Sequence, residues 1–271
     1  MKQTNIILQH LSIGYRKRHH QRTVAEDLCA HLQGGQLTCL IGANGTGKST
    51  LLKTMAGVLP PLTGSILIKE REDDGEEKQE RLDSLSTRQL ARKVSVVLTS
   101  GDEPFNLTTE ETIALGRSPY TGFWGTLAPQ DQAVVDEAIR QTGIANLRNR
   151  SVPSLSDGER QKVMIAKALA QQTPIIYLDE PTAFLDYPSK VELLQLLCRL
   201  AHTLGKTILL STHDVELALQ LADRLWLMQG AGILTTGTPR EMADSGALSS
   251  FLERPGIVFD KERLAVMVER H

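Results

Sequence analysis

Residues 42–50 read Gly42-Ala43-Asn44-Gly45-Thr46-Gly47-Lys48-Ser49-Thr50, directly after the apolar run Gln36–Ile41. The run predicts a buried strand, and the residues from Lys48 to Met55 predict the helix that follows it. A glycine-rich turn between a strand and a helix directs successive backbone N–H groups toward an anion. In such a loop a lysine reaches the β- and γ-phosphates of a nucleotide, and a serine hydroxyl is available to Mg²⁺. We therefore predict a nucleotide phosphate site at residues 42–50.

Two adjacent carboxylates follow a second apolar run. Asp179 comes directly after Ile175–Leu178, and Glu180 is the next residue. Ligands collect at the carboxyl ends of central strands, and a carboxylate placed there can hold Mg²⁺ through water. The side chain of Glu180 would orient or deprotonate an attacking water, although on sequence alone Glu180 could also simply end the strand. The pair favours hydrolysis of the nucleotide over binding alone.

Two further motifs stand at the start of a helix and at the end of a strand. The first is Leu155-Ser156-Asp157-Gly158-Glu159, at the start of a predicted helix that continues to Ala170. Ser156 and the Gly158 amide there predict a second anion site, although the string alone is also an ordinary helix cap. The second is Ser211-Thr212-His213-Asp214, which places His213 directly after the predicted strand Thr207–Ser211.

Together the four motifs resemble those of the ATP-binding cassette (ABC) ATPases over most of the chain. Residues 155–159 are similar to the signature sequence of that family, with Asp157 and Glu159 in place of the commoner Gly and Gln. The resemblance implies that Ser156, Asp157, Gly158 and Glu159 contact ATP held by the other subunit of a dimer. It also implies that ATP lies on residues 42–50, that Ser49 and Asp179 hold Mg²⁺, and that Glu180 and His213 are catalytic.

The same resemblance suggests roles for three other positions. Tyr15 occupies the place where the family stacks an aromatic ring on adenine, although packing within a strand is an open alternative. The loop that communicates between the two nucleotide sites is matched by Phe184, Leu185 and Asp186. The family's glutamine after the strand Val94–Thr99 is absent, and we hypothesise that Ser100 or Asp102 takes its place toward metal and water.

The resemblance also implies a transport role. The chain has one set of nucleotide motifs, and residues 112–122 resemble the importer branch for iron-siderophores, haem and cobalamin. This predicts a homodimer docked on integral membrane permease subunits at the cytoplasmic face of the inner membrane, with an extracytoplasmic substrate-binding protein as an indirect partner. One alternative is a soluble ABC ATPase that acts on nucleic acid or a macromolecular assembly. The other is a nucleotide-binding regulator without hydrolysis.

Composition restricts these alternatives. Charged residues make up 23% of the 271 residues and the formal net charge is −2, which argues against a dedicated nucleic-acid binder. Cys29, Cys39 and Cys198 are far apart in sequence, and we expect buried, apolar thiols in a reducing compartment. The N-terminus lacks the pattern of a secretory signal, and no apolar run approaches the roughly 18 residues that a membrane span needs.

The predicted fold is an α/β P-loop NTPase of ABC type, with a largely parallel central sheet, an antiparallel β piece and a helical subdomain. Strands that alternate with helices indicate the parallel sheet. We expect one ABC ATPase domain over 1–271, with the helical subdomain at about 100–160 inserted in a RecA-like core. A short C-terminal tail at about 238–271 would include a hairpin after Arg254. The charged residues 69–83 predict a solvated surface loop.

Overall fold

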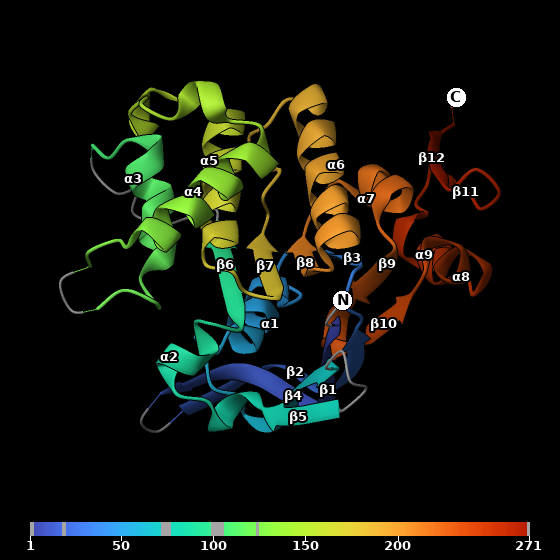
Figure 1. The fold of residues 1–271 in the computed structure, drawn as a ribbon. Coiled ribbons are helices and arrows are strands. Elements are labelled where there is room, and N and C mark those ends of the chain that lie inside the picture. Colours follow the sequence, from blue (N-terminus) through green and yellow to red (C-terminus); the bar gives the residue numbers. More distant parts are fainter. Residues whose placement is uncertain (1–2, 18–19, 72–76, 99–105, 123–124, 270–271) are drawn as a thin grey trace. The chain divides into compact units, whose positions relative to one another are not determined.

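The computed structural model describes residues 3–17, 20–71, 77–98, 106–122 and 125–269 (Figure 1). The chain forms two compact units. The first comprises Met1–Ser84 and Leu197–His271, and the second comprises Leu85–Leu196, so that the second boundary falls within helix α6 (Tyr187–Leu204). In the described part of the chain, none of the helices has both the length and the apolar character that crossing a membrane requires.

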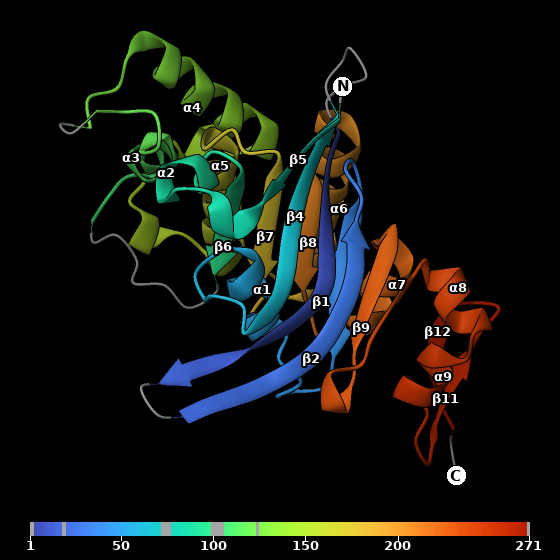
Figure 2. The same cartoon turned by 90° about the horizontal axis from the view of Figure 1, so that it is seen from below.

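The first unit contains an antiparallel sheet with the strand order β2-β1-β4-β5. Its strands are β1 (Gln3–Lys17), β2 (His20–Leu32), β4 (Thr63–Arg71) and β5 (Glu77–Arg81). The three longest strands lie side by side in Figure 2. β2 is absent from the sequence predictions, and the prediction of a loop over residues 69–83 is wrong at β5. β5 pairs with β4 as a polar strand at the edge of the sheet, where no apolar alternation is needed.

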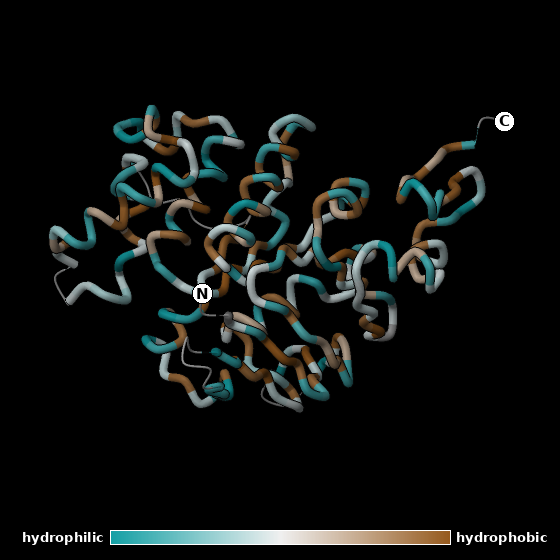
Figure 3. The backbone as a smooth tube through the Cα atoms, turned by 45° about the vertical axis from the view of Figure 1, so that its right-hand side comes forward, coloured by the Kyte–Doolittle hydropathy of each residue, from teal (hydrophilic) through white to brown (hydrophobic). Residues whose placement is uncertain are grey.

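Buried parallel strands form the interior of the same unit. β3 (Leu37–Gly42) pairs in parallel with β8 (Thr207–Ser211) and with β9 (Arg224–Met228), and β10 (Leu234–Gly237) is antiparallel to β9. All residues of β3 and β8 are buried, which is why both read as continuous apolar runs rather than alternating ones. Figure 3 shows the chain passing repeatedly between hydrophobic and hydrophilic stretches.

Helices follow the strands of the first unit, as the sequence predicts for α1 (Lys48–Met55). The short helices of its C-terminal half are α7 (Val215–Leu221), α8 (Pro239–Asp244) and α9 (Ala247–Leu252). The predicted hairpin is confirmed, because β11 (Ile257–Asp260) pairs antiparallel with β12 (Ala265–Val268).

The second unit combines two parallel strands with helices that pack on one another. β6 (Val94–Leu98) pairs with β7 (Ile175–Asp179) in parallel. The helices are α2 (Thr87–Leu90), α3 (Thr109–Ala114), α4 (Pro129–Thr142) and α5 (Asp157–Ala170), and α3, α4 and α5 contact one another. The predicted helices at 129–142 and 158–170 are confirmed, together with the mixed fold class of mostly parallel strands, an antiparallel sheet and helices.

A buried ion pair joins the helices of the second unit. The guanidinium of Arg117 donates to the Asp131 carboxylate at 3.0 Å and to the Ala170 carbonyl oxygen at 2.6 Å, and it lies 4.0 Å from the ring centroid of Tyr120. The side chains of Arg117 and Asp131 are 5% and 9% exposed. The backbone N–H of Ala128 and the Arg117 guanidinium lower the pKa of Asp131. Removal of Arg117 would leave this carboxylate without its charged partner.

We expect Arg117→Ala to lower the free energy of unfolding by about 3 kcal/mol, because breaking a buried pair leaves an uncompensated charge. Arg140 provides the matched control, since its pair with Glu137 is exposed and such pairs contribute little. Arg140→Ala should therefore leave the unfolding free energy nearly unchanged. Urea titration of both variants measures the difference, and equal losses would contradict the assignment of Arg117 to the core.

Candidate functional site

The glycine loop lies between β3 and α1, where the sequence predicts it. Gly47 has a φ of 106°, and a Cβ added there would come within 2.5 Å of Val24 Cγ1 on β2. Gly42 has a φ of 154°, and a Cβ there would lie 2.2 Å from the Met228 carbonyl oxygen. Only glycine fits these two close approaches. The loop is therefore held tightly between β2 and β9, and neither Val24 nor Met228 carries a sequence signal that would have identified it.

Lys48 is buried and places its ammonium group over the loop. The residue is 6% exposed, and its Nζ donates to the carbonyl oxygens of Gly42 at 2.8 Å and Ala43 at 3.1 Å. Thr46 Oγ1 donates to the Ala43 carbonyl at 2.9 Å, which closes the turn from the other side. A positive charge held beside backbone N–H groups at a helix N-terminus suits an anion such as a phosphate.

Tyr15 lies next to the start of α1 as well. Its hydroxyl is 3.1 Å from Thr50 Oγ1, and the residue is 43% exposed. It borders a cavity of about 220 Å³ whose other walls are Gly14, Arg16 and residues 59–62. An exposed ring at the edge of a cavity is compatible with stacking on a base, the role suggested by the resemblance, and its hydroxyl contact with Thr50 brings it to the start of α1.

His213 is exposed and stands at the same edge of the parallel strands as Gly42. Leu40 of β3 pairs with Ser211 of β8, and the Thr212 amide donates to the Leu40 carbonyl at 3.1 Å. Thr212 is buried, and its hydroxyl accepts from the Asp214 amide at 3.0 Å, which fixes the turn around His213. The first unit therefore brings together Tyr15, residues 42–50 and His213.

Asp179 and Glu180 lie in the second unit, at the carboxyl end of β7. The first four residues of β7 are buried and Asp179 is partly exposed, so the charged side chain begins where the apolar strand ends. Glu180 has a φ of 51°, a left-handed conformation that is rare for a non-glycine residue. Such strain costs on the order of 1–3 kcal/mol and collects at functional sites. The backbone thus turns sharply at the residue predicted to act on water.

Ser156 begins α5 through a capping box. Its hydroxyl accepts from the Glu159 amide at 3.3 Å, and the Glu159 carboxylate accepts from the Ser156 amide at 2.9 Å. The motif Ser-x-x-Glu carries this signal in the sequence. A Cβ added to Gly158 would meet only Ser189 at 3.5 Å, an ordinary contact, so the helix start is uncrowded.

The charge of Glu159 contributes to the stability of this helix start. The Ser156 amide holds the pKa of Glu159 below its ordinary value, so the stabilisation is present above that value and is lost as the pH falls through the folded-state pKa. We expect Glu159→Gln, which keeps the capping bonds, to lower the unfolding free energy by about 0.5 kcal/mol at neutral pH. The difference should vanish in acid. Denaturant titrations across this pH range test it, and a constant difference would contradict the assignment.

Residues 184–186 form an exposed loop before α6. Phe184 is 88% exposed with a φ of 66°, and Tyr187 after the loop is 60% exposed. The Asp186 carboxylate accepts from the Ser189 amide at 3.0 Å, and the Ser189 hydroxyl and amide lower the pKa of Asp186. An exposed aromatic side chain on this loop and another at the start of α6 are typical of a surface that meets another protein.

The predicted site residues thus fall into two groups, one in each unit. The first unit carries Tyr15, residues 42–50 and His213. The second unit carries Ser156, Asp157, Gly158, Glu159, Asp179, Glu180, Phe184, Leu185 and Asp186. Ser100 and Asp102, the hypothesised substitutes for the missing glutamine, lie outside the described residues.

Comparison with known proteins agrees with the motifs. The family model described as ABC transporter matches residues 25–183. The achromobactin transport ATP-binding protein CbrD of Dickeya dadantii is 37% identical over 91% of this chain and 87% of its own. The ferric enterobactin transport ATP-binding protein FepC of Escherichia coli is 35% identical over 86% of this chain and 82% of its own. An inward-facing transporter structure ascribed to the metal-chelate type is 25% identical, with a TM-score of 0.74 over 92% of this chain and 88% of that one.

Proposed function

This chain belongs to the ABC transporter family, and on that premise we propose that it powers the import of a metal chelate such as an iron-siderophore, haem or a cobalamin. The chain binds ATP and is an ATP hydrolase, as members of this family are. The observation that carries the choice of cargo is the identity of 35–37% to two siderophore transport subunits over 86–91% of the chain. The cargo itself is not expected to touch this subunit.

We assign the triphosphate of ATP to residues 42–50. The buried Lys48 ammonium supplies the positive charge, and Gly47 lets the loop pass close to Val24, where a side chain would not fit. Tyr15 borders the neighbouring cavity and is assigned to the adenine ring. Both assignments rest on groups that lie within the first unit.

Ser49 and Asp179 are assigned to hold Mg²⁺. Their hydroxyl and carboxylate oxygens are the hard ligands that this ion prefers. Asp179 is partly exposed at the end of β7, so its carboxylate is accessible to an ion. When bound, the ion neutralises charge on the phosphate oxygens.

Glu180 is assigned as the group that accepts a proton from the attacking water. Glu180 follows Asp179 at the carboxyl end of β7 with left-handed backbone, and proton transfer to a positioned base accelerates such reactions. His213 is assigned to contact the γ-phosphate, because the buried Thr212 and its bond to the Asp214 amide fix the exposed imidazole at the strand end.

We further propose that two copies of the chain close over two ATP molecules. Residues Ser156, Asp157, Gly158 and Glu159 of one copy would meet ATP held by the other, at the uncrowded start of α5. Phe184, Leu185 and Asp186 would communicate between the two sites. The dimer would dock on integral membrane permease subunits at the cytoplasmic face of the inner membrane, with a substrate-binding protein on the other side. We propose that residues 1–271 form one ABC ATPase domain, with a helical subdomain at about 100–160.

Uptake assays in the native host test the choice of cargo. A strain that lacks this chain should lose uptake of one radiolabelled metal chelate from a panel of ferric catecholate, ferric hydroxamate, ferric carboxylate, haem and cobalamin. Uptake of an amino acid provides the control. The wild-type gene should restore the lost uptake, whereas a Glu180→Gln gene should not. Unchanged uptake of every chelate would overturn the proposal of metal-chelate import.

A further inference from the structure

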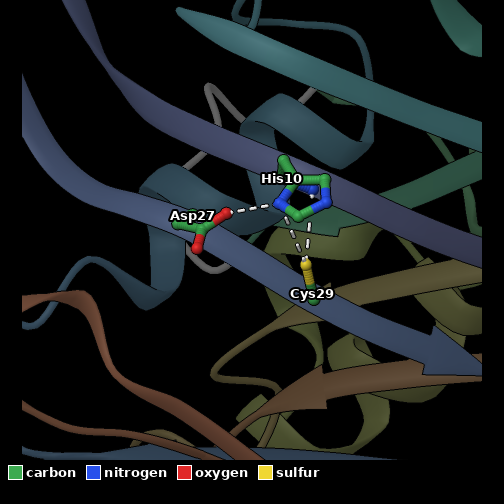
Figure 4. A group of neighbouring side chains, drawn as sticks. All are labelled: His10, Asp27 and Cys29. Carbon is green, nitrogen blue, oxygen red and sulfur yellow. Dashed lines mark hydrogen bonds and ion pairs between the residues drawn. The ribbon is translucent and has the colours of Figure 1, made fainter.

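A group of three chemically reactive side chains lies on the antiparallel sheet and takes no part in the nucleotide site. His10 belongs to β1, and Asp27 and Cys29 belong to β2 (Figure 4). The register between the strands slips between Leu8 and Leu11 and again between Leu11 and Ile13, so each strand carries a bulge. The prediction that Cys29 is buried is wrong, because its thiol is exposed. A strand so rich in polar residues as β2 buries only some of its side chains.

The two bulges turn the side chains toward one another. His10 and Asp27 have φ values of 47° and 55°, in the left-handed region. Bulges are known to redirect side chains in this way. Gly64 on β4 makes room for the bulge at His10, because a Cβ there would lie 2.2 Å from the His10 carbonyl oxygen. Residues of β1, β2 and β4 therefore all contribute to this arrangement.

The contacts converge on one nitrogen. His10 Nδ1 is 2.6 Å from Asp27 Oδ1 and 3.9 Å from Cys29 Sγ, and one ligand atom from each residue lies within 4.8 Å of the others. A nucleophile–base–orienter relay would need the thiol and the carboxylate on opposite ring nitrogens. Both groups approach the same nitrogen here, which disfavours a relay and leaves three donor atoms of different chemistry within 4.8 Å of one another.

The ion pair between His10 and Asp27 does not by itself account for this arrangement. His10 and Asp27 are 80% and 75% exposed, and ion pairs at such exposure contribute little to stability. Left-handed backbone is uncommon at residues other than glycine, although histidine and aspartate adopt it more readily than most. The feature to be explained is therefore the meeting of three metal-ligand side chains at two neighbouring bulges.

We propose that His10, Asp27 and Cys29 bind a thiophilic divalent cation, for which Zn²⁺ is the representative. Imidazole nitrogen, thiolate sulfur and carboxylate oxygen are the three donor types that Zn²⁺ takes in proteins, and a site with three protein ligands leaves a fourth position for water. The thiolate selects against Mg²⁺, so this site is chemically distinct from the nucleotide site. Binding replaces the S–H bond of Cys29 by a metal–sulfur bond and releases the thiol proton to solvent.

The test is calorimetric titration of the full-length chain with Zn²⁺ alone, without nucleotide or Mg²⁺ and with the thiols kept reduced. We expect saturable binding at one ion per chain, with a heat that varies with the buffer because a proton is released. Co²⁺ in place of Zn²⁺ should give a sulfur-to-metal charge-transfer band. Cys29→Ser should abolish the band, since it removes the thiolate and keeps the size of the side chain.

Three variants and one control complete the experiment. Cys29→Ser, His10→Asn and Asp27→Asn should each weaken Zn²⁺ binding by at least about tenfold. Asparagine tolerates the left-handed backbone at positions 10 and 27, so the strands should stay intact, which circular dichroism verifies. His202→Gln is the matched control, because His202 pairs with Asp223 at 2.8 Å outside this group. Absence of saturable binding, or equal affinity in the three variants and the wild type, would overturn the proposal.

Discussion

Glu180→Gln should lower the rate of ATP hydrolysis by at least about a hundredfold while ATP still binds. Glutamine has the shape of glutamate but cannot accept a proton from water at neutral pH. Glu180 has a φ of 51°, and glutamine meets the same backbone cost, so the substitution isolates the chemical role from the fold. The turnover number in a coupled assay of phosphate release measures the first effect.

The second expected effect of Glu180→Gln is a stable dimer. If two copies enclose ATP and reopen only after hydrolysis, the variant should remain dimeric with ATP and monomeric without it. Size-exclusion chromatography with and without ATP distinguishes the two states. Glu137→Gln is a suitable control, since Glu137 pairs with Arg140 on the exposed side of α4. Turnover at the wild-type rate in the Glu180 variant would show that another group activates the water.

Local signals were sufficient for several elements of the fold. The helix α1 begins and ends where Lys48 and Met55 predict it, because a glycine loop precedes it and Gly57 follows it. The helix α4 begins at Pro129 and ends before Gly143, whose φ of 70° suits a helix C-terminus. In each case glycine or proline, whose backbone preferences differ from those of other residues, marks the boundary of the helix.

Other elements could not be predicted because their stability comes from partners far away in the sequence. β2 mixes polar and charged residues such as Arg22, Glu26 and Asp27 with apolar ones, and its two-residue periodicity is broken at the bulge. β5 is polar throughout, and only its pairing with β4 makes it a strand. No short-range pattern encodes either interaction.

The site shows the same division. The sequence indicates residues 42–50 and Asp179 as candidates, because the predicted chemistry requires particular residue types beside apolar strands. The left-handed backbone of Glu180 and Phe184 was not predicted, because it results from the packing around two residues that ordinarily avoid this conformation. The contact of Val24 with Gly47 and the group around His10 likewise depend on the register of β1 and β2.

Lys48→Met should reduce ATP affinity by at least about tenfold and remove measurable hydrolysis. Methionine keeps most of the length and the apolar stem of lysine, so much of the packing of the buried side chain is retained, but it cannot donate to the phosphates. A hydrogen bond to a charged group contributes about 1.5–3 kcal/mol, and one such bond already corresponds to about ten- to a hundredfold in affinity. The carbonyl oxygens of Gly42 and Ala43 also lose a donor, so some loss of stability is expected.

A thermal shift measurement separates loss of binding from loss of folding. In the wild type, saturating Mg²⁺-ATP should raise Tm, because a ligand that binds only the folded state stabilises it. The Lys48→Met chain should unfold in a single transition, and at the same ATP concentration its Tm should rise less than that of the wild type. Lys53→Met is the matched control, since Lys53 lies in the last turn of the same helix, away from the loop, and its Tm should rise as in the wild type. A rise in the Lys48 variant as large as that in the wild type would mean that Lys48 does not hold the triphosphate, whatever the transported cargo is.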